Sequence, residues 1–207
     1  MALTTTVLAD GLRRVAIHME SVADTLNVLD GQLGDGDLGV TMTRGGRALQ
    51  EILPTLPADV GLALMACAQA ITKVSGSSYG TLLATGLLAA AKATRGRTEV
   101  AWSETASLLR AALAAMMARG KAALGDKTVL DALDAAAGAA EGKTEPEEIL
   151  RSAAKAVDAT LERMRGMQAR IGRARIFAER SVGLDDPGMR AFQEMLRGLQ
   201  AGSREPD

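Results

Sequence analysis

The sequence predicts an all-α fold, in which eight helices run up and down as antiparallel neighbours in one bundle. Aromatic residues make up only 2% of the 207 residues and apolar residues 47%, so Ala, Leu, Val and Met must fill the core. Ala and Leu are strong helix formers. Apolar residues also recur at helical spacing with short links between the segments, which favours antiparallel neighbours. We expect a single domain over residues 1–207, with a short polar tail from about residue 202.

The first helix is expected over residues 6–28, because apolar residues form one seam along it. They repeat at alternating steps of four and three residues, which is typical of a helix face packed against a core. The seam consists of Leu8, Leu12, Val15, Met19, Val22, Leu26 and Leu29. His18, the only histidine, lies next to this seam and is expected to be structural or exposed to solvent.

An acidic, glycine-rich turn follows this helix. Asp30, Asp35 and Asp37 lie among four glycines between two helical segments. Three carboxylates so close together repel one another unless a cation lies between them. Carboxylate oxygens suit Mg²⁺, which usually accompanies a phosphate. The spacing does not fit an EF-hand, whose twelfth-position Glu is missing, and the alternative is a solvated acidic connection between two helices.

The next three helices are expected over residues 40–53, 60–73 and 79–94. Pro54 ends the first of them, and the free N–H groups at its start could bind a phosphate. The link 74–81 is small and rich in hydroxyl groups, so its N–H and O–H groups could surround phosphates. An ordinary turn with a serine cap is the alternative for this link.

The fifth, sixth and seventh helices are identified by their ends. Ser103 is expected to cap the fifth helix, which reaches about residue 118 and is closed by Gly120. Asp126 is expected to cap the sixth helix. A capping-box pattern at residues 144–147 starts the seventh helix, which extends over residues 145–167.

The end of the seventh helix and the loop that follows it are rich in arginine. Such a cluster could hold an anionic phosphate, and the alternative is a solvated basic face paired with Glu162 and Glu179. The eighth helix begins after Asp186 as its N-cap, with Pro187 in the first helical position. The arginines are Arg163, Arg165, Arg170, Arg173, Arg175 and Arg180.

Polar or glycine-containing loops recur at alternate helix junctions, at residues 30–39, 74–79, 119–128 and 172–188. In an up-and-down bundle, alternate junctions lie at the same end. The four loops should therefore converge, and they would bring the Asp cluster, the serine loop, the Gly-Asp-Lys-Thr turn and the arginines into one site.

Composition argues against several classes of protein. A net charge of −1 and only four aromatic residues disfavour a nucleic-acid partner. No apolar run is long enough to span a bilayer and no signal segment opens the chain, so we expect a cytoplasmic protein with no membrane contact. Cys67 is the only cysteine and lies in an apolar run, which indicates a buried thiol. The single histidine excludes histidine-rich metal sites.

Four segments in these loops resemble the motifs of the nucleotide-binding subunit of dihydroxyacetone kinases, the DhaL type. The segments occur in the expected order and at the expected distances, over nearly the whole chain. They are Leu29-Asp30 to Arg44-Gly45, Ser75-Gly76 to Gly80-Thr81, Gly120-Lys121 with Gly125-Asp126-Lys127-Thr128 to Leu133, and Gly172-Arg173-Ala174 to Asp186-Pro187-Gly188.

The resemblance implies a barrel of eight antiparallel helices with ADP or ATP bound across one end. Asp30, Asp35 and Asp37 would hold a pair of Mg²⁺ ions. It implies no catalytic side chain beyond this site, although Arg173 could stabilise charge. The implied nucleotide-binding residues are Leu38, Gly39, Val40, Thr41, Val74, Ser75, Gly76, Gly120, Thr128, Val129, Arg173, Asp186, Pro187 and Gly188.

The resemblance also implies the reaction and its partners. The chain would transfer a phosphoryl group to a short-chain ketose held on a separate DhaK-type subunit, with ATP or a phosphotransferase-system protein as donor. A homodimer is compatible with this assignment. The alternatives are a kinase subunit for another ketose such as a tetrulose, a nucleotide-bound module that docks on a regulator, the N-terminal domain of a fatty-acid kinase, or a purely structural helical protein.

The sequence departs from the family pattern at several site positions. Leu38 replaces a histidine that is common in the family, and Thr41 stands where asparagine is frequent. Ser77 and Ser78 replace Pro and Leu, and Arg175 replaces a serine. The segment 176–178, Ile-Phe-Ala, replaces Tyr-Leu-Gly. The three acidic residues are retained, so the hypothesis is a working kinase subunit with altered specificity.

Overall fold

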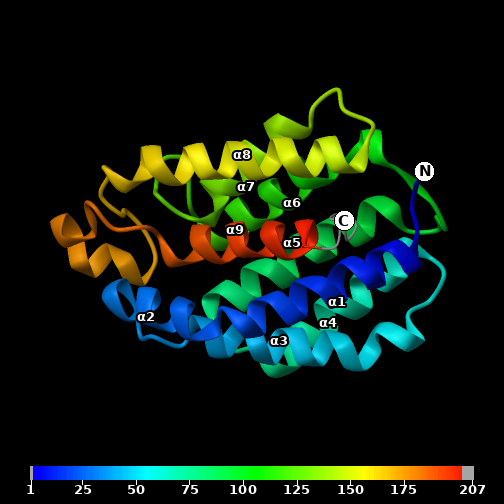
Figure 1. The fold of residues 1–207 in the computed structure, drawn as a ribbon, viewed down its shortest axis with the longest axis horizontal. Helices are drawn as coiled ribbons and strands as arrows, with labels where there is room; N and C mark the ends of the chain where they lie inside the picture. The colour runs from blue at the N-terminus through cyan, green and yellow to red at the C-terminus, as the bar shows by residue number, and fades with distance from the viewer. Residues whose placement is uncertain (1, 202–207) are drawn as a thin grey trace, which may run out of the picture.

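A computed structural model describes residues 2–201, which fold into nine α-helices with three short 3₁₀ helices and a small two-stranded ladder (Figure 1). The strands β1 (Ala2–Leu3) and β2 (Val100–Ala101) pair antiparallel. The 3₁₀ helices are η1 (Leu53–Thr55), η2 (Trp102–Glu104) and η3 (Arg173–Ser181). The α-helices are α1 (Thr5–Ser21), α2 (Ala23–Leu33), α3 (Leu38–Ile52), α4 (Val60–Val74), α5 (Ser78–Thr94), α6 (Thr105–Gly120), α7 (Val129–Ala140), α8 (Pro146–Arg165) and α9 (Pro187–Gln200).

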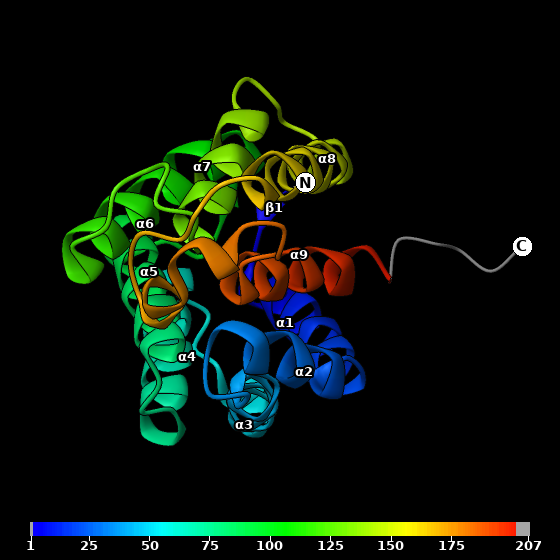
Figure 2. The same ribbon diagram turned by 90° about the vertical axis from the view of Figure 1, so that its left-hand side faces the viewer.

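Eight of these helices form a closed ring. Each of α3 to α9 packs on the next, α9 packs on α1, and α1 packs on α3. Figure 2 looks along the long axis and shows the helices arranged around it. Figures 1 and 2 together show α2, the start of α9 and the segment around η3 at one end of this barrel. The predicted all-α fold of antiparallel helices is therefore confirmed.

The first predicted helix is broken in two, which the sequence did not indicate. Val22 leaves the helical conformation (φ −105°, ψ 7°), so α1 ends at Ser21 and α2 begins at Ala23. The apolar seam continues through the break without a change of spacing, and periodicity therefore gives no sign of it. The bend brings the backbone of Ala23 close to Gly39, where an added Cβ would lie 1.9 Å from the Ala23 carbonyl oxygen.

Two predicted helix caps are wrong. Ser103 lies inside η2, and α6 begins only at Thr105. Asp126 accepts a hydrogen bond from the N–H of Ala123 at 2.8 Å, so it closes the turn before the helix. Thr128 caps α7 in its place. In both regions a second polar side chain competes for the helix start, and the local pattern alone does not decide between them.

Other helix ends are closer to the prediction. Asp186 caps α9 and accepts a hydrogen bond from the N–H of Met189 at 2.8 Å, as predicted. Glu145 precedes α8 without a side-chain cap, so the predicted capping box does not form. At the end of α6 the left-handed residue is Lys121 (φ 50°), not Gly120.

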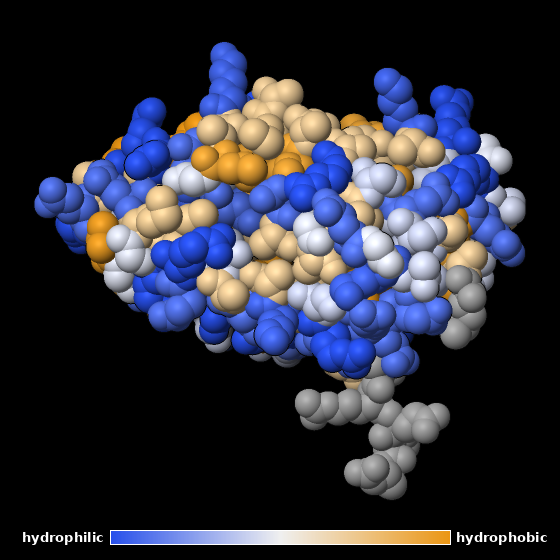
Figure 3. All heavy atoms as spheres, turned by 90° about the horizontal axis from the view of Figure 1, so that it is seen from above, coloured by the Kyte–Doolittle hydropathy of each residue, from blue (hydrophilic) through white to orange (hydrophobic). Residues whose placement is uncertain are grey.

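Amphipathic helices place their apolar faces inside the barrel. In α8 the buried apolar residues recur at steps of three or four, and all of them except Ile149 belong to one core cluster with α7 and α9. Figure 3 looks down on the side of the molecule where α8 lies and shows mostly hydrophilic and intermediate side chains with small apolar areas between them. No helix within residues 2–201 is long and apolar enough to cross a membrane. The buried residues of α8 are Ile149, Ala153, Val157, Thr160, Leu161 and Met164.

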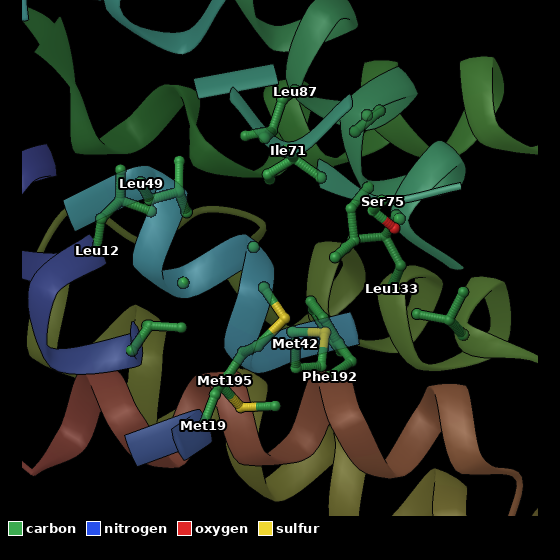
Figure 4. A pocket seen from close by; sticks show the side chains of 18 of the residues that line it. Leu12, Met19, Met42, Leu49, Ile71, Ser75, Leu87, Leu133, Phe192 and Met195 are labelled. Carbon is green, nitrogen blue, oxygen red and sulfur yellow. The ribbon is translucent and has the colours of Figure 1, made fainter. Parts of the chain in front are cut away.

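The middle of the barrel holds an apolar cavity of about 230 Å³ (Figure 4). Its lining comes from α1, α3, α4, α5, α6, α7 and α9, and Figure 4 shows Met19, Met42, Phe192 and Met195 around it. Cys67 is fully buried in an adjacent apolar cluster, and burial raises the pKa of its thiol to about 11, so the predicted buried thiol is confirmed.

Candidate metal and nucleotide site

The three acidic residues of the first loop meet at the loop end of the barrel. One carboxylate oxygen from each of Asp30, Asp35 and Asp37 lies within 4.8 Å of the others. Asp30 is half-buried, and Asp35 and Asp37 are exposed. Asp30 lies in the last turn of α2, so one ligand candidate belongs to a helix, where the prediction placed it in the loop. A set of carboxylate oxygens in this arrangement suits a hard divalent cation such as Mg²⁺.

Glycine makes the tight geometry of this turn possible. Gly36 adopts a positive φ of 76°, which L-residues rarely do. Asp30 also holds the turn directly, since its Oδ2 accepts a hydrogen bond from the N–H of Asp37 at 3.0 Å. The acidic cluster is therefore part of a fixed turn in which one carboxylate both shapes the backbone and faces the other two.

The first turn of α3 matches the predicted phosphate cradle only in part. The N–H of Val40 donates to the side-chain oxygen of Asn27 at 3.2 Å, a partner that the sequence did not predict. Leu38 and Gly39 are buried, and Leu38 packs in a core cluster that includes Met42. Thr41 lines the inner apolar cavity. Among these four residues, Leu38 reaches the loop-end pocket.

The link between α4 and α5 forms a turn with a serine cap, which was the alternative interpretation of this segment. Ser77 caps α5 by accepting a hydrogen bond from the N–H of Gly80 at 3.0 Å. The hydroxyl groups of Ser75 and Ser77 lie 3.0 Å apart, and Ser75 lines the inner cavity. A Cβ added at Gly76 would meet no atom within 4 Å, and Val74 is 39% exposed. Open space at Gly76 is compatible with close approach of a ligand to the backbone.

A pocket of about 170 Å³ opens at this end of the barrel, between segments that are far apart in sequence. It unites the acidic turn with the start of α7, the segment before η3 and the start of α9. Gly120 lies outside it, behind Leu82. Leu33 and Tyr79 fall within two of the quoted motifs but were not named as site residues, and no motif includes Leu82 or Ile171. The lining residues are Asp30, Leu33, Leu38, Tyr79, Leu82, Thr128, Val129, Ile171, Gly172, Arg173, Ala174, Asp186, Pro187 and Gly188.

The pocket wall contains two ionisable groups with shifted pKa values. Burial raises the pKa of the Asp186 carboxyl to about 7. Burial and the nearby Asp186 carboxylate also raise the pKa of Tyr79. The hydroxyl of Tyr79 donates to the carbonyl oxygen of Gly188 at 3.1 Å, which joins α5 to α9 across the pocket. Near neutral pH the Asp186 carboxyl therefore changes its charge, and with it the hydrogen bonds that it can offer.

Residues 166–183, which we call the strap, connect α8 to the loop before α9 and contain η3. The strap places Arg173 beside the acidic turn, where its guanidinium forms an ion pair with Asp35. Two other arginines have structural roles. Arg165 at the end of α8 donates to Asp185 at 2.9 Å, and Arg180 lies 5.7 Å from the centre of the Phe177 ring. Arg165 also forms an ion pair with Glu162 at 2.6 Å, so the predicted pairing of the basic face with Glu162 is confirmed.

The chain is similar to a known family over most of its length. The family model described as the DAK2 domain matches residues 32–201. The ADP-binding subunit DhaL of the PEP-dependent dihydroxyacetone kinase of Escherichia coli is 29% identical over 210 residues, which cover 99% of this chain and 100% of that protein. The human triokinase/FMN cyclase is 34% identical over 204 residues, which cover 90% of this chain and 34% of that protein.

Solved structures share the fold. The native form of the dihydroxyacetone kinase of C. freundii matches with a TM-score of 0.77 and 27% identity, over 96% of this chain and 34% of that one. A crystal structure of the same kinase in complex with AMP-PNP and Mg²⁺ matches with a TM-score of 0.72 and 24% identity, over 99% of this chain and 35% of that one. The chain thus spans about a third of the length of the C. freundii and human proteins.

Proposed function

The chain belongs to the DAK2 domain family, and from this membership and the loop-end site we propose that it is the nucleotide-binding subunit of a dihydroxyacetone-type kinase. The observation that carries the proposal is the convergence of the Asp30–Asp35–Asp37 cluster, Arg173 and the pocket at one end of the barrel. Such an arrangement supplies what phosphoryl transfer requires, which is positioning and neutralisation of charge.

The donor set fits a metal–nucleotide complex. The three Asp carboxylates are hard oxygen ligands and would hold Mg²⁺, two ions in our proposal, while the nucleotide occupies the pocket beside them. When bound, the metal ions would neutralise the phosphate oxygens. Arg173 would exchange its contact with Asp35 for the phosphates, and Thr128, Val129 and residues 186–188 would enclose the rest of the nucleotide.

The ketose acceptor is proposed to lie on a separate DhaK-type subunit. The single histidine of this chain, His18, pairs with Glu194 at 2.8 Å, and neither residue lines the pocket. His18 is therefore not available to hold a substrate at the site. The E. coli relative is described as PEP-dependent and the human relative as a triokinase, so the phosphoryl donor is either a phosphotransferase-system protein or ATP. A homodimer and a cytoplasmic location stay predictions.

Calorimetry of the purified chain with ADP and ATP tests the proposal, first with Mg²⁺ and then with EDTA. Mass spectrometry beforehand should detect any co-purified nucleotide. We expect binding that requires Mg²⁺. Retained ADP that resists exchange would favour the protein donor, and free exchange would favour ATP. Absence of binding under every condition would overturn the proposed function and leave the fold unaffected.

A partner assay separates the kinase from its alternatives. The chain is mixed with a DhaK-type subunit loaded with dihydroxyacetone or a tetrulose, and the phosphorylated ketose is measured. Transfer to a tetrulose alone would indicate a different substrate. Mg²⁺-dependent nucleotide binding without transfer to either ketose would favour the module that docks on a regulator.

A further inference from the structure

Lys127 is a buried cation that the site described above does not use. Its side chain is 1% exposed. The ammonium group donates to three backbone carbonyl oxygens, those of Ser181 at 2.7 Å, Met167 at 2.8 Å and Arg165 at 3.3 Å. A lysine ammonium has three N–H donors. All three are therefore satisfied by main-chain oxygens within one small region.

These three carbonyl groups mark the two ends of the strap. Arg165 ends α8, Met167 lies at the beginning of the strap, and Ser181 closes η3. The same region contains two further ties, because the N–H of Gly183 donates to the Arg165 carbonyl at 2.8 Å and the N–H of Ala169 donates to the Ser181 hydroxyl at 2.9 Å. One nitrogen atom thus holds the beginning and the end of the strap together.

The position of Lys127 also links the strap to the opposite wall of the pocket. Thr128 and Val129 follow it directly and line the pocket, and residues 171–174 of the strap line it from the other side. The backbone of Lys127 has a left-handed φ of 62°, and Asp131 fixes this turn by accepting from the N–H groups of Gly125 and Thr128. Lys127 is therefore held rigidly at one wall while its ammonium group holds the other.

We propose that Lys127 is a positioning residue of the nucleotide site, which ties the strap to the start of α7 and so fixes Arg173 over the acidic turn. This inference rests on the proposed function, since it assigns the fixed strap a role in holding the nucleotide. Lys127 does not line the pocket, and it acts through the strap.

The charge of Lys127 is suited to this role. Carbonyl groups at the C-terminal end of a helix carry partial negative charge, so a cation stabilises the end of α8. Burial lowers the pKa of Lys127, while the nearby Asp186 and Asp185 carboxylates act in the opposite direction. A neutral side chain of the same length would leave buried carbonyl oxygens without donors, which favours opening of the strap.

Lys127→Met is the first test, because methionine is also unbranched and leaves the backbone preference little changed. Hydrogen exchange without nucleotide should become faster in residues 166–183, and Mg²⁺-ADP affinity should fall about 10- to 100-fold, as for other residues that orient a ligand site. Two controls accompany it. Lys155→Met removes an exposed lysine of α8, and Val60→Ala should lower the melting temperature through a buried site of α4 whose core cluster contains no strap residue.

The controls separate positioning from general stability. Val60→Ala should leave both the strap exchange and the affinity unchanged, even where its melting temperature matches that of Lys127→Met. Equal losses of affinity in both variants would overturn the proposal, and so would faster strap exchange with unchanged affinity. If wild-type chain binds no nucleotide, the proposed function fails, while the exchange data still decide whether Lys127 holds the strap.

Lys127→Arg keeps the test decisive if the methionine variant does not fold. A planar guanidinium retains the charge but cannot direct three donors in the same directions. We expect a folded protein in which strap exchange is faster, and nucleotide affinity lower, than in wild type and the Val60→Ala control. A folded arginine variant with faster strap exchange and full affinity would refute the positioning role.

Discussion

The two halves of the candidate site are held in different ways. The acidic half, residues 30–41, is held by bonds over short distances in sequence: the N–H of Asp37 donates to the Asp30 carboxylate, 7 residues away, and the N–H of Val40 to Asn27, 13 residues away. The strap half depends on contacts between distant segments: Lys127 binds carbonyls 38 to 54 residues away, and Tyr79 binds the Gly188 carbonyl 109 residues away.

This difference separates the metal ligands from the parts that close over the nucleotide. A turn whose bonds are local can keep its shape when remote packing changes. A strap tied through one buried ammonium loses its position when the fold or that group is altered. We therefore expect metal-site substitutions to affect binding without opening the strap, and strap substitutions to affect both.

The largest effect is expected from Asp35→Asn. It removes one proposed ligand and relieves repulsion among the carboxylates, so Mg²⁺-ADP affinity should fall by about 100-fold while the fold stays intact. Calorimetry measures the affinity, and hydrogen exchange should show the strap still protected. Asp24→Asn, which changes a carboxylate in the first turn of α2 that is not part of the cluster, is the matched control. Unchanged affinity in Asp35→Asn would show that the metal assignment is wrong.

Gly39→Ala tests whether the acidic half depends on close packing. The new Cβ would meet the Ala23 carbonyl oxygen at 1.9 Å, so either α2 or α3 must move. Overpacking against backbone should lower the free energy of unfolding by about 3 kcal/mol or less, measured by urea titration. Gly45→Ala is its control on α3, since nothing lies within 4 Å of a Cβ there. Equal stability of the two variants would contradict the close approach of the helices.

The strap half should also respond to pH through Asp186. Burial raises the pKa of this carboxyl to about 7, above its value in the unfolded chain, so the folded protein binds the extra proton. Its contribution to stability is complete below about pH 4 and is lost as pH rises through 7.

Between pH 5 and 8 the wild type should lose roughly 1–3 kcal/mol of unfolding free energy relative to Asp186→Asn, since one pKa unit corresponds to about 1.4 kcal/mol. Asparagine retains the ability to cap α9. Urea titrations of both proteins at several pH values, without nucleotide, provide the measurement. A difference between them that does not vary with pH would argue against the raised pKa.

The same contrast explains what the sequence could predict. The helical fold follows from composition and periodicity, which are local, and the Asp cluster follows from one turn. The break at Val22, the bond from Val40 to Asn27 and the place of Tyr79 in the pocket arise from packing between helices. No rule of residue spacing predicts these three features. For the bond to Val40, the sequence offers only a polar residue, Asn27, between Leu26 and Val28 in the predicted helix.

Lys127 illustrates most clearly what the sequence could not predict. The Gly-Asp-Lys-Thr turn resembles a family motif, and the sequence therefore marks the turn as part of the site. It does not show that the lysine points away from the pocket, because its three acceptors are main-chain atoms at the end of α8 and in the loop that follows it. Every residue has a main-chain carbonyl group, so the identity of a residue does not show that its carbonyl accepts a hydrogen bond from Lys127.

The smallest expected effect comes from a strained residue within the strap. Ala178 adopts φ 47° and ψ −124° in η3, a conformation that favours glycine. Ala178→Gly should relieve strain of about 1–3 kcal/mol, less the roughly 0.5–1 kcal/mol entropic cost of glycine. The free energy of unfolding should therefore rise slightly. Urea titration would detect the gain, and hydrogen exchange should place it in residues 166–183.

Ala174→Gly is the matched control for this gain, because Ala174 lies in the same 3₁₀ segment, is buried and does not have a positive φ. There the glycine removes a packed methyl group from the cluster with Leu33 and Ala169, and the variant should be destabilised. Opposite signs for the two substitutions would locate the strain at Ala178 alone. Destabilisation by both would show that the backbone conformation of Ala178 stores no strain that glycine can relieve.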